Sequence, residues 1–199
     1  MKKILFVSLI LCFVTCFSQE KKIETSQEFQ DNLNKEYSNA EESPLMPEDL
    51  KTFKGLDFYP INSKFIVEAK FIRTKNEKVF KMKTSTSRTP EYIKYGELVF
   101  TIDADEFKLN LYQNIDLIKK EGYADYLFLP FSDETCGKES YIGGRYIDMK
   151  IPTGETMIID FNKAYNPYCA YNHKYSCPIV PLENDLKIAI LAGVKKFHE

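Results

Sequence analysis

The sequence predicts a mainly β protein, built as a single antiparallel β-barrel or β-sandwich of about eight strands with a short N-terminal helical arm. Beyond Asn62, apolar residues recur at every second position, which is the spacing of a strand with one face in a core and the other in water. No helical pattern separates these segments, so parallel βαβ units are not expected. The 199 residues also include 13 Tyr, 15 Phe and no Trp, and Tyr and Phe are enriched in strands.

The part of the chain before the strands is expected to be helical. Phe29, Leu33 and Tyr37 recur every four residues in a polar stretch, and this spacing predicts an amphipathic helix with a narrow apolar stripe. A second, short helix is expected to begin at Pro47, because Pro suits the first helical position and acidic residues follow it. Gly55 should end it.

The strand-like segments follow one another at short intervals. They cover residues 65–71, 80–82, 98–102, 107–111, 126–131, 145–150, 157–161 and 186–191. The segment 126–131 is apolar on both faces, so we expect it to lie centrally, with one face in the core and the other under a loop or the N-terminal helix. Asp103-Ala104-Asp105 predicts a hairpin between two of the segments, and Pro152-Thr153-Gly154 predicts a turn between two others.

Residues 1–18 have the composition of a signal peptide. Two lysines precede an apolar run over residues 4–17, which is too short for a comfortable membrane span. Cleavage after Ser18 would make Gln19 the first residue of an exported, periplasmic or secreted chain without a transmembrane helix. Two alternatives stay open: a retained N-terminal anchor, and lipid attachment through Cys16.

The rest of the chain divides into a helical arm or linker over residues 19–43 and a single β-domain over residues 44–195. Lys and Arg total 27 against 29 Asp and Glu, for a formal net charge of −2. A nucleic-acid-binding domain is typically strongly basic, so no nucleic-acid partner is expected.

Candidate functional residues gather in two loop-rich segments, of which the first is 132–146. Glycines stand there beside Lys138 and Arg145. Glycines let backbone N–H groups approach an anion, and a guanidinium binds carboxylate or phosphate in a fork, so the segment predicts a small anionic ligand. The alternative is that Gly143-Gly144 forms a hairpin bend or bulge and that Arg145 pairs with a structural acid.

The second segment is 160–178, which is rich in Tyr and Asn. Asp160 and Asn162 share one face at the end of a strand, so they could line a cleft. Alternatively, Asp160, Asn162 and Asn166 fasten a long loop to the barrel through side-chain to backbone hydrogen bonds. The candidate ligand-binding residues of the two segments are Lys138, Glu139, Tyr141, Arg145, Asp160, Asn162, Tyr165, Asn166 and Tyr171.

Removal of the signal peptide leaves three cysteines, Cys136, Cys169 and Cys177. In an oxidising compartment we expect a disulfide between Cys169 and Cys177, which would stabilise the loop by roughly 2 to 3 kcal/mol. A rival hypothesis is a metal site made by Cys169, His173 and Cys177, with Cys136 as a fourth ligand. That spacing matches no standard zinc module, so we expect neither a metal nor a cofactor.

Several motifs resemble the bacterial and archaeal domain-of-unknown-function 1684 family over about residues 43–195. They include Gly55-Leu56-Asp57-Phe58-Tyr59-Pro60, Leu127-Phe128-Leu129-Pro130-Phe131, Gly143-Gly144-Arg145-Tyr146, Asp160-Phe161-Asn162-Lys163-Ala164-Tyr165-Asn166-Pro167 and Cys177-Pro178. The resemblance implies that the segments 132–146 and 160–178 form one shared feature, as a site or as a structural clasp. It assigns no catalytic residue.

Two function classes follow from these observations. The first is an exported small-ligand-binding or interaction β-domain of the cell envelope, whose partner is a small anionic ligand or another envelope protein. The alternative is a hydrolase-like or transferase-like enzyme with a carboxylate and arginine cleft built from Lys138, Glu139, Arg145, Asp160 and Asn162. The common serine-hydrolase and metalloprotease motifs are absent from the sequence.

Overall fold

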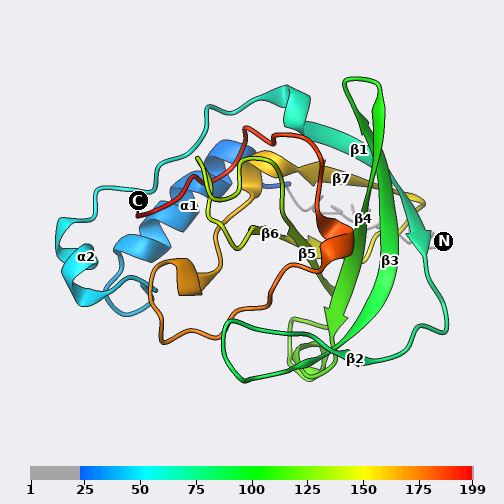
Figure 1. Ribbon diagram of the computed structural model, residues 1–199, viewed down its shortest axis with the longest axis horizontal. Helices are drawn as coiled ribbons and strands as arrows, with labels where there is room; N and C mark the ends of the chain where they lie inside the picture. The colour runs from blue at the N-terminus through cyan, green and yellow to red at the C-terminus, as the bar shows by residue number, and fades with distance from the viewer. Residues whose placement is uncertain (1–22, 199) are drawn as a thin grey trace, which may run out of the picture.

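The computed structural model describes residues 23–198 of the chain. A curled antiparallel sheet forms a half-barrel, accompanied by a few short helices and one longer N-terminal helix (Figure 1). The mainly β, antiparallel architecture expected from the sequence is therefore confirmed. The predicted signal peptide and Cys16 lie outside the described residues. Within residues 23–198, no helix is long and apolar enough to cross a membrane.

The sheet has an order that explains why it curls. Its strands are β1 (Ile66–Arg73), β2 (Phe80–Lys81), β3 (Glu91–Ile102), β4 (Asp105–Asn114), β5 (Tyr126–Phe131), β6 (Arg145–Lys150) and β7 (Thr156–Asp160). They pair in the order β6-β5-β4-β3-β1-β7, with β2 beside β3. The edge strands β6 and β7 are joined only by residues 151–155, a connection that spans at most roughly 20 Å. Since this connection is so short, the two edges are brought toward each other at that end.

The predicted hairpin between β3 and β4 is confirmed. Ile102 pairs with Asp105, so Asp103 and Ala104 are the two turn residues. Their φ angles are +51° and +73°, the left-handed conformation that a type I′ hairpin turn requires at both positions. An alanine rarely adopts this conformation.

The segment 186–191, which was expected to be a strand, does not form one. Its first half makes two backbone hydrogen bonds with residues 132–134, from the Leu186 N–H at 2.8 Å and to the Ile188 carbonyl at 3.2 Å. Beyond them the Ile190 N–H donates to Asp133 Oδ2 at 2.8 Å and the Ile190 carbonyl accepts from Arg145 at 3.0 Å, so buried side chains satisfy the backbone where the pairing stops. Leu186 and Ile190 are nevertheless buried, so the alternating pattern reported burial correctly and secondary structure wrongly.

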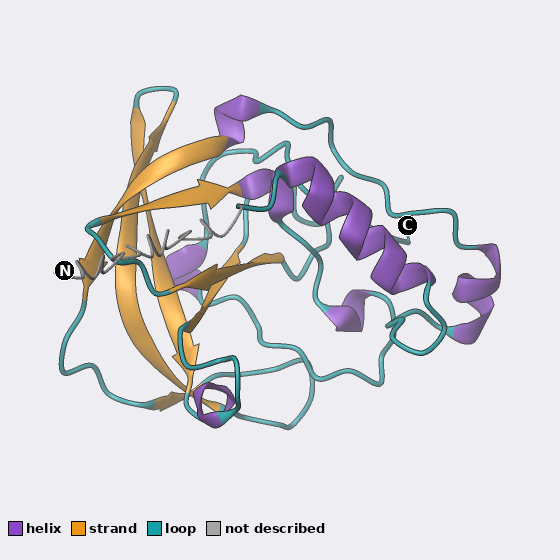
Figure 2. Ribbon diagram, turned by 180° about the vertical axis from the view of Figure 1, so that it is seen from behind, coloured by secondary structure: helices purple, strands orange, loops and turns teal. Residues whose placement is uncertain are grey.

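The two predicted helices are α1 (Ser26–Ser38) and α2 (Pro47–Thr52). A capping box begins α1: Thr25 Oγ1 accepts from the Glu28 N–H at 3.1 Å, and the Glu28 carboxylate accepts from the Thr25 N–H at 2.9 Å. Figure 2 shows the sheet on one side of the molecule, with α1 running away from it toward α2. Single 3₁₀ turns are η1 (Ser63–Phe65), η2 (Leu117–Lys119), η3 (Phe161–Lys163), η4 (Tyr168–Ala170) and η5 (Leu182–Asn184).

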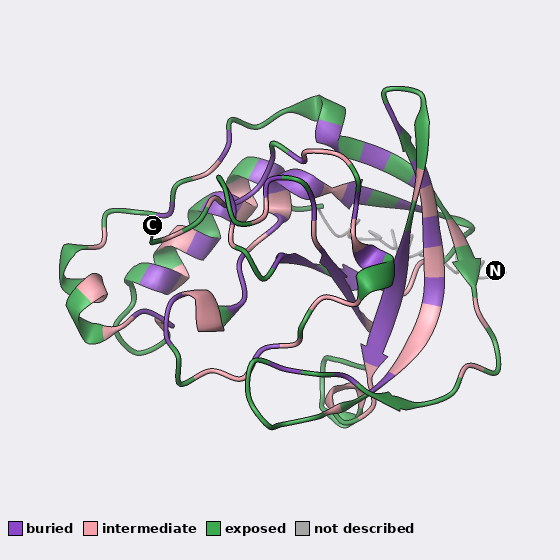
Figure 3. Cartoon of the chain, in the orientation of Figure 1, coloured by how far each residue is buried: buried purple, intermediate pink, exposed green. Residues whose placement is uncertain are grey.

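Strand β5 and residues 109–113 of β4 are buried on both faces (Figure 3). On β5, Leu127 and Leu129 belong to the main core, whereas Phe128 belongs to a second cluster with Tyr92 and Tyr146. The strand lies between β4 and β6, inside the sheet as predicted. The second face of these strands carries the site described next.

Candidate functional site

Strand β6 holds two polar residues in opposite environments. Arg145 faces the core with Ile147, and its side chain has no exposed surface. Asp148 points to the other face and is exposed. This alternation follows from the period of two along a strand, and it separates a buried charge from a reachable one.

Arg145 is the centre of a buried clasp. It donates to Asp133 Oδ1 at 3.1 Å and to the Ile190 carbonyl at 3.0 Å, and it also donates to the Ala192 carbonyl. Asp133 has no exposed side-chain surface either. These contacts show that Arg145 pairs with a structural acid, which was the alternative to anion binding. The guanidinium holds the C-terminal segment against the barrel.

The polar residues after β7 make similar fastening contacts. Ser26 Oγ donates to Asp160 Oδ2 at 2.6 Å and ties the start of α1 to the sheet. The Asn162 amide pairs with the backbone of Asn62 in both directions, at 2.9 and 3.1 Å. Asn166 donates to a carbonyl of the C-terminal segment at 2.9 Å. Asn162 and Asn166 have no exposed surface, and the hydrogen bonds of both amides fasten backbone segments within the protein.

The remaining sequence-predicted residues separate into different places. Lys138 and Glu139 are exposed and line neither of the two cavities described below. Tyr141 and Tyr171 line the larger cavity, and Tyr165 lines the smaller one. The two predicted segments do meet, because Tyr165 pairs through its backbone with the beginning of β6. The two segments thus share the larger cavity through Tyr141 and Tyr171, whereas Arg145, Asn162 and Asn166 are buried and line neither cavity.

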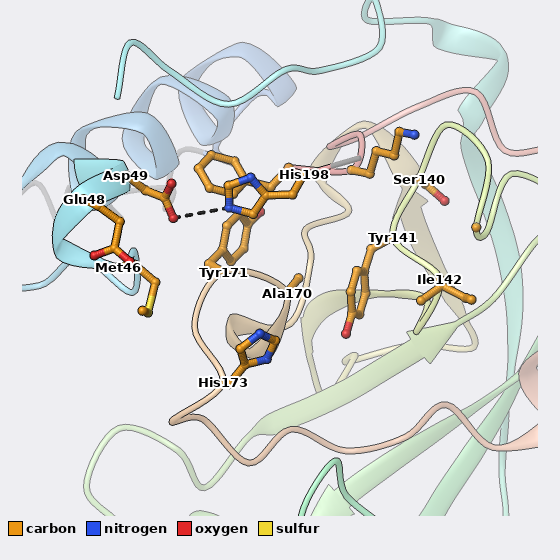
Figure 4. Close-up of a pocket in the computed structure, with 13 residues that line it drawn as sticks. Met46, Glu48, Asp49, Ser140, Tyr141, Ile142, Ala170, Tyr171, His173 and His198 are labelled. Atoms are coloured by element: carbon orange, nitrogen blue, oxygen red, sulfur yellow. Dashed lines mark hydrogen bonds and ion pairs between the residues drawn. The ribbon is translucent and has the colours of Figure 1, made fainter. Parts of the chain in front are cut away.

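The larger cavity lies between α2, the loop after β5 and the C-terminal segment (Figure 4). Its volume is about 570 Å³, and its lining includes charges of both signs, Glu48, Asp49 and Lys196. Asp49 Oδ2 already pairs with His198 Nε2 at 3.2 Å. His173 also lines it, from the loop that carries η4. Its mixed charge gives no clear preference for a ligand.

The smaller cavity, here called the aromatic cleft, lies on the second face of β3, β5 and β6, under α1 and the loop over residues 165–178. Its volume is about 350 Å³. It is lined by Phe29, Leu33, Glu36, Tyr92, Leu117, Tyr126, Phe128, Tyr146, Asp148, Tyr165, Pro167, Tyr168, Cys177 and Pro178. None of these lining residues is Lys, Arg or His. The covering helix and loop are those expected over the second face of 126–131.

Asp148 provides a carboxyl group inside this cleft. The hydroxyl groups of Tyr126 and Tyr165 both donate to its Oδ1, at 2.7 and 2.6 Å. Crowding by protein atoms removes water and raises the pKa of the Asp148 carboxyl above its ordinary value, and the hydrogen bonds from Tyr165 and Tyr126 oppose that rise. The group is thus partly dehydrated yet reachable from the cleft, a combination typical of functional carboxyls.

The aromatic walls are held in place by specific contacts. Tyr146 and Tyr165 exchange two backbone hydrogen bonds, at 2.9 and 3.0 Å. The Tyr146 ring meets Phe128 edge-on, with 4.7 Å between centroids and 74° between planes, and its hydroxyl donates to the Pro178 carbonyl. At the rim, Tyr168 donates to a Glu36 carboxylate oxygen at 2.8 Å. The side chains around Asp148 are therefore positioned before any ligand arrives.

Cys169 and Cys177 lie in the loop that separates the two cavities. The predicted disulfide is not formed, since both are free thiols. They are nevertheless in contact, because the Cys169 N–H donates to Cys177 Sγ at 3.2 Å. The hydrogen bond with the Cys177 thiol lowers the pKa of Cys169 to about 6. Cys136 instead hydrogen-bonds with Asp133 and Ser140.

The sequence pattern missed the side chains that make the aromatic cleft, above all Asp148 and Tyr126. A signal existed for Asp148. It is a charged residue on the face of β6 that neighbours the second apolar face of β5, and Phe128 pairs directly with it. This neighbourhood becomes visible only when β5 and β6 are known to pair, and the sequence did not predict that pairing.

The fold and the cleft define a small β half-barrel domain with one acidic, aromatic pocket. The chain belongs to the family described as a protein of unknown function, DUF1684, whose model matches residues 51–195. Its fold is similar to the solution structure of an uncharacterised protein of Haloarcula marismortui, at 31% sequence identity and a TM-score of 0.67. That match covers 85% of this chain and 91% of the archaeal one. A search of curated proteins gives no match.

Proposed function

We propose that this protein binds a small ligand and that the aromatic cleft is the binding site. The observation that carries the proposal is Asp148, a reachable carboxyl group among aromatic rings. Small-molecule pockets are typically about 300–1,000 Å³, mostly apolar, with a few placed polar groups. The cleft, at about 350 Å³, has that size and composition.

A screen by thermal denaturation tests the proposal. A library of cationic, neutral and anionic small molecules would be added to the purified protein, and the shift in Tm measured for each. Leu117 lines the cleft, and Ile142 lines the larger cavity. Leu117→Trp should abolish the shifts by filling the cleft, whereas Ile142→Trp, the same bulk in the other cavity, should leave them unchanged. Shifts lost only in Ile142→Trp, or no shift with any compound, would contradict the proposal.

We also propose that the chain is exported. The lysines before the apolar run over residues 4–17 and the polar residues after it support this. Cells expressing the full chain would be fractionated, and the mass of the protein in each fraction measured. A mature form beginning at Gln19 in the exported fraction is expected, and a lipid-modified form would begin at Cys16. A full-length protein confined to the cytoplasm would contradict export.

In an oxidising compartment, we propose that Cys169 and Cys177 form the disulfide predicted from the sequence. Their contact and the lowered pKa of Cys169 support this, because a thiolate attacks an incoming disulfide. The two thiols would give up two protons and two electrons, and the incoming disulfide would be reduced to two thiols. Alkylation of the exported protein should then label Cys136 alone, with Cys169 and Cys177 labelled after reduction. Labelling of all three before reduction would contradict the proposal.

A second candidate function is catalysis at the same carboxyl group. A carboxyl with a raised pKa, hydrogen-bonded to two phenols, is typical of a general acid. The enzyme cleft expected from the sequence has less support, since Arg145 and Asn162 are completely buried. Turnover of chromogenic esters and glycosides, lost in Asp148→Asn, would favour catalysis over binding alone.

A further inference from the structure

We propose that the ligand of the aromatic cleft is an organic cation of the alkylated ammonium class. The inference rests on the proposed function, since it names the chemistry of what that cleft binds. It replaces the anionic ligand expected from the sequence, which depended on Lys138 and Arg145. Charge, hydrogen-bonding capacity and ring geometry support it independently.

The charge of the cleft has one sign. Its lining residues include two carboxylates, Glu36 and Asp148, and none of Lys, Arg or His. Asp148 receives its hydrogen bonds from Tyr126 and Tyr165, which are neutral partners, and both end on Oδ1. A cation entering the cleft would therefore meet a negative charge that no basic lining residue neutralises. An anion would be repelled by it.

Four of the five tyrosine hydroxyl groups that line the cleft already donate to protein acceptors. Tyr126 and Tyr165 donate to Asp148, Tyr146 donates to the Pro178 carbonyl, and Tyr168 donates to Glu36. Each of these phenols has one hydrogen to give. An anionic ligand needs hydrogen-bond donors, and these four hydroxyl groups already donate to acceptors within the protein. The cleft can offer a ligand carboxylate oxygen and ring faces instead.

The rings stand at steep angles to one another. Tyr146 is at 74° to Phe128 and at 89° to Tyr165, with centroids 4.7 and 6.0 Å apart. Tyr92 adds a tilted ring 6.0 Å from Phe128. All of these rings line the cleft, and the negative face of an aromatic ring attracts a cation. Aromatic side chains that contact a ligand cation recognise quaternary ammonium groups through this attraction.

An alkylated ammonium fits better than a metal ion. Ca²⁺ takes six to eight oxygen ligands, and Mg²⁺ needs six in an octahedron. Within residues 23–198, no group of three His, Cys, Asp or Glu side chains is placed to hold a metal. A bulky cation with apolar methyl groups needs aromatic rings and one carboxylate. The cleft provides both, because Asp148 lies among aromatic side chains.

Calorimetric titration with choline and with 3,3-dimethylbutan-1-ol tests the inference, because the alcohol has the same shape with an uncharged carbon in place of nitrogen. Choline should bind at least about tenfold more tightly than the alcohol. Asp148→Asn should lower the affinity for choline by at least about tenfold and leave that for the alcohol unchanged. The control is Asp103→Asn, the same change in the β3–β4 turn, where a positive φ of 51° suits Asn.

Glu36→Gln is a second variant, on α1, that removes a carboxylate without altering the sheet. It should also weaken choline binding, by a smaller factor than Asp148→Asn. Equal affinity for the alcohol and choline, or tighter binding of an anion in the cleft, would overturn the cationic ligand while leaving the binding function intact. Failure of every library compound to bind in the cleft would instead overturn the proposed function itself.

Discussion

Two aspartates on the same barrel show how similar side chains acquire different roles. Asp133 has no exposed side-chain surface and is bound by the Arg145 guanidinium, a backbone N–H and a threonine hydroxyl. Asp148 is bound by two tyrosine hydroxyls and remains exposed in the aromatic cleft. The first carboxylate is saturated by the protein, and the second retains capacity for a ligand.

The comparison teaches that charge-rich motifs and binding sites are different things in this fold. The glycine and arginine segment is more conspicuous in the sequence than the residues of the cleft. Its Arg145, however, donates from the end of the guanidinium to Asp133 and to backbone carbonyls. The cleft has one carboxylate at its centre and owes its chemistry to aromatic neighbours from several strands.

Replacing Arg145 should destabilise the protein most. Arg145→Met leaves the Asp133 carboxylate buried and unpaired, and breaking a buried pair in this way typically costs about 3 to 5 kcal/mol. The control is Lys150→Met on the same strand, whose ion pair with Asp125 is exposed and should contribute less than about 1 kcal/mol. Urea unfolding measures both. A loss below about 1 kcal/mol for Arg145→Met would mean that the clasp is not structural.

Asn162 should matter next, because its amide holds the backbone of Asn62. Asn162→Ala removes the three hydrogen bonds of a buried side-chain amide and should lower the free energy of unfolding by about 1 to 3 kcal/mol. Asn32→Ala, on an exposed position of α1, is the matched control and should have little effect. Equal stability of the two variants would show that Asn162 is free for another role.

Tyr165→Phe should have a smaller effect on stability and a specific effect on Asp148. It removes one hydrogen bond, a loss of about 0.5 to 1.5 kcal/mol. Because that bond lowers the pKa of Asp148, the pKa should rise further in the variant. Carboxyl ¹³C NMR titration measures it, with Tyr123→Phe as a control outside the cleft. An unchanged or lower Asp148 pKa would contradict the assigned hydrogen bond.

The smallest expected effect is a change in how the free energy of unfolding depends on pH. Folding raises the pKa of Asp148, so the folded protein binds that proton more tightly than the unfolded chain does. The contribution of Asp148 to the free energy of unfolding should therefore fall as the pH rises from its ordinary pKa to the raised one. Urea unfolding across this range should show the fall in the wild type and its absence in Asp148→Asn. Parallel pH profiles would contradict the raised pKa.

Much of the fold follows from local pattern. The spacing of Phe29, Leu33 and Tyr37 predicted α1, and the alternation along 98–102 and 107–111 predicted the β3–β4 hairpin. The pattern failed at 186–191, because its backbone pairing with residues 132–134 stops after two hydrogen bonds and the distant side chains of Asp133 and Arg145 bond the backbone of Ile190 instead. No local signal reports such a partner.

The site was harder to predict for the same reason. The guanidinium of Arg145 predicted an anion-binding residue. Its burial depends on the pairing with Asp133, which the sequence did not predict. The surroundings of Asp148 come from Tyr126 on β5 and from Tyr165 beyond β7. Strand β5 pairs directly with β6, and Tyr165 is joined to β6 by a single bridge to Tyr146. Strand pairing of this kind is a property of the whole fold and cannot be read from one segment.

Mapping of backbone amide shifts during a choline titration of ¹⁵N-labelled protein would show whether the aromatic cleft, and not the Arg145 clasp, binds the ligand. We expect the shifts to gather at Tyr126, Phe128, Asp148 and Tyr165, around the aromatic cleft. The amides of Asp133 and Arg145 should stay unchanged, because the clasp is closed to ligands. Shifts centred instead on Tyr141, His173 and Lys196, which line the larger cavity, would contradict it.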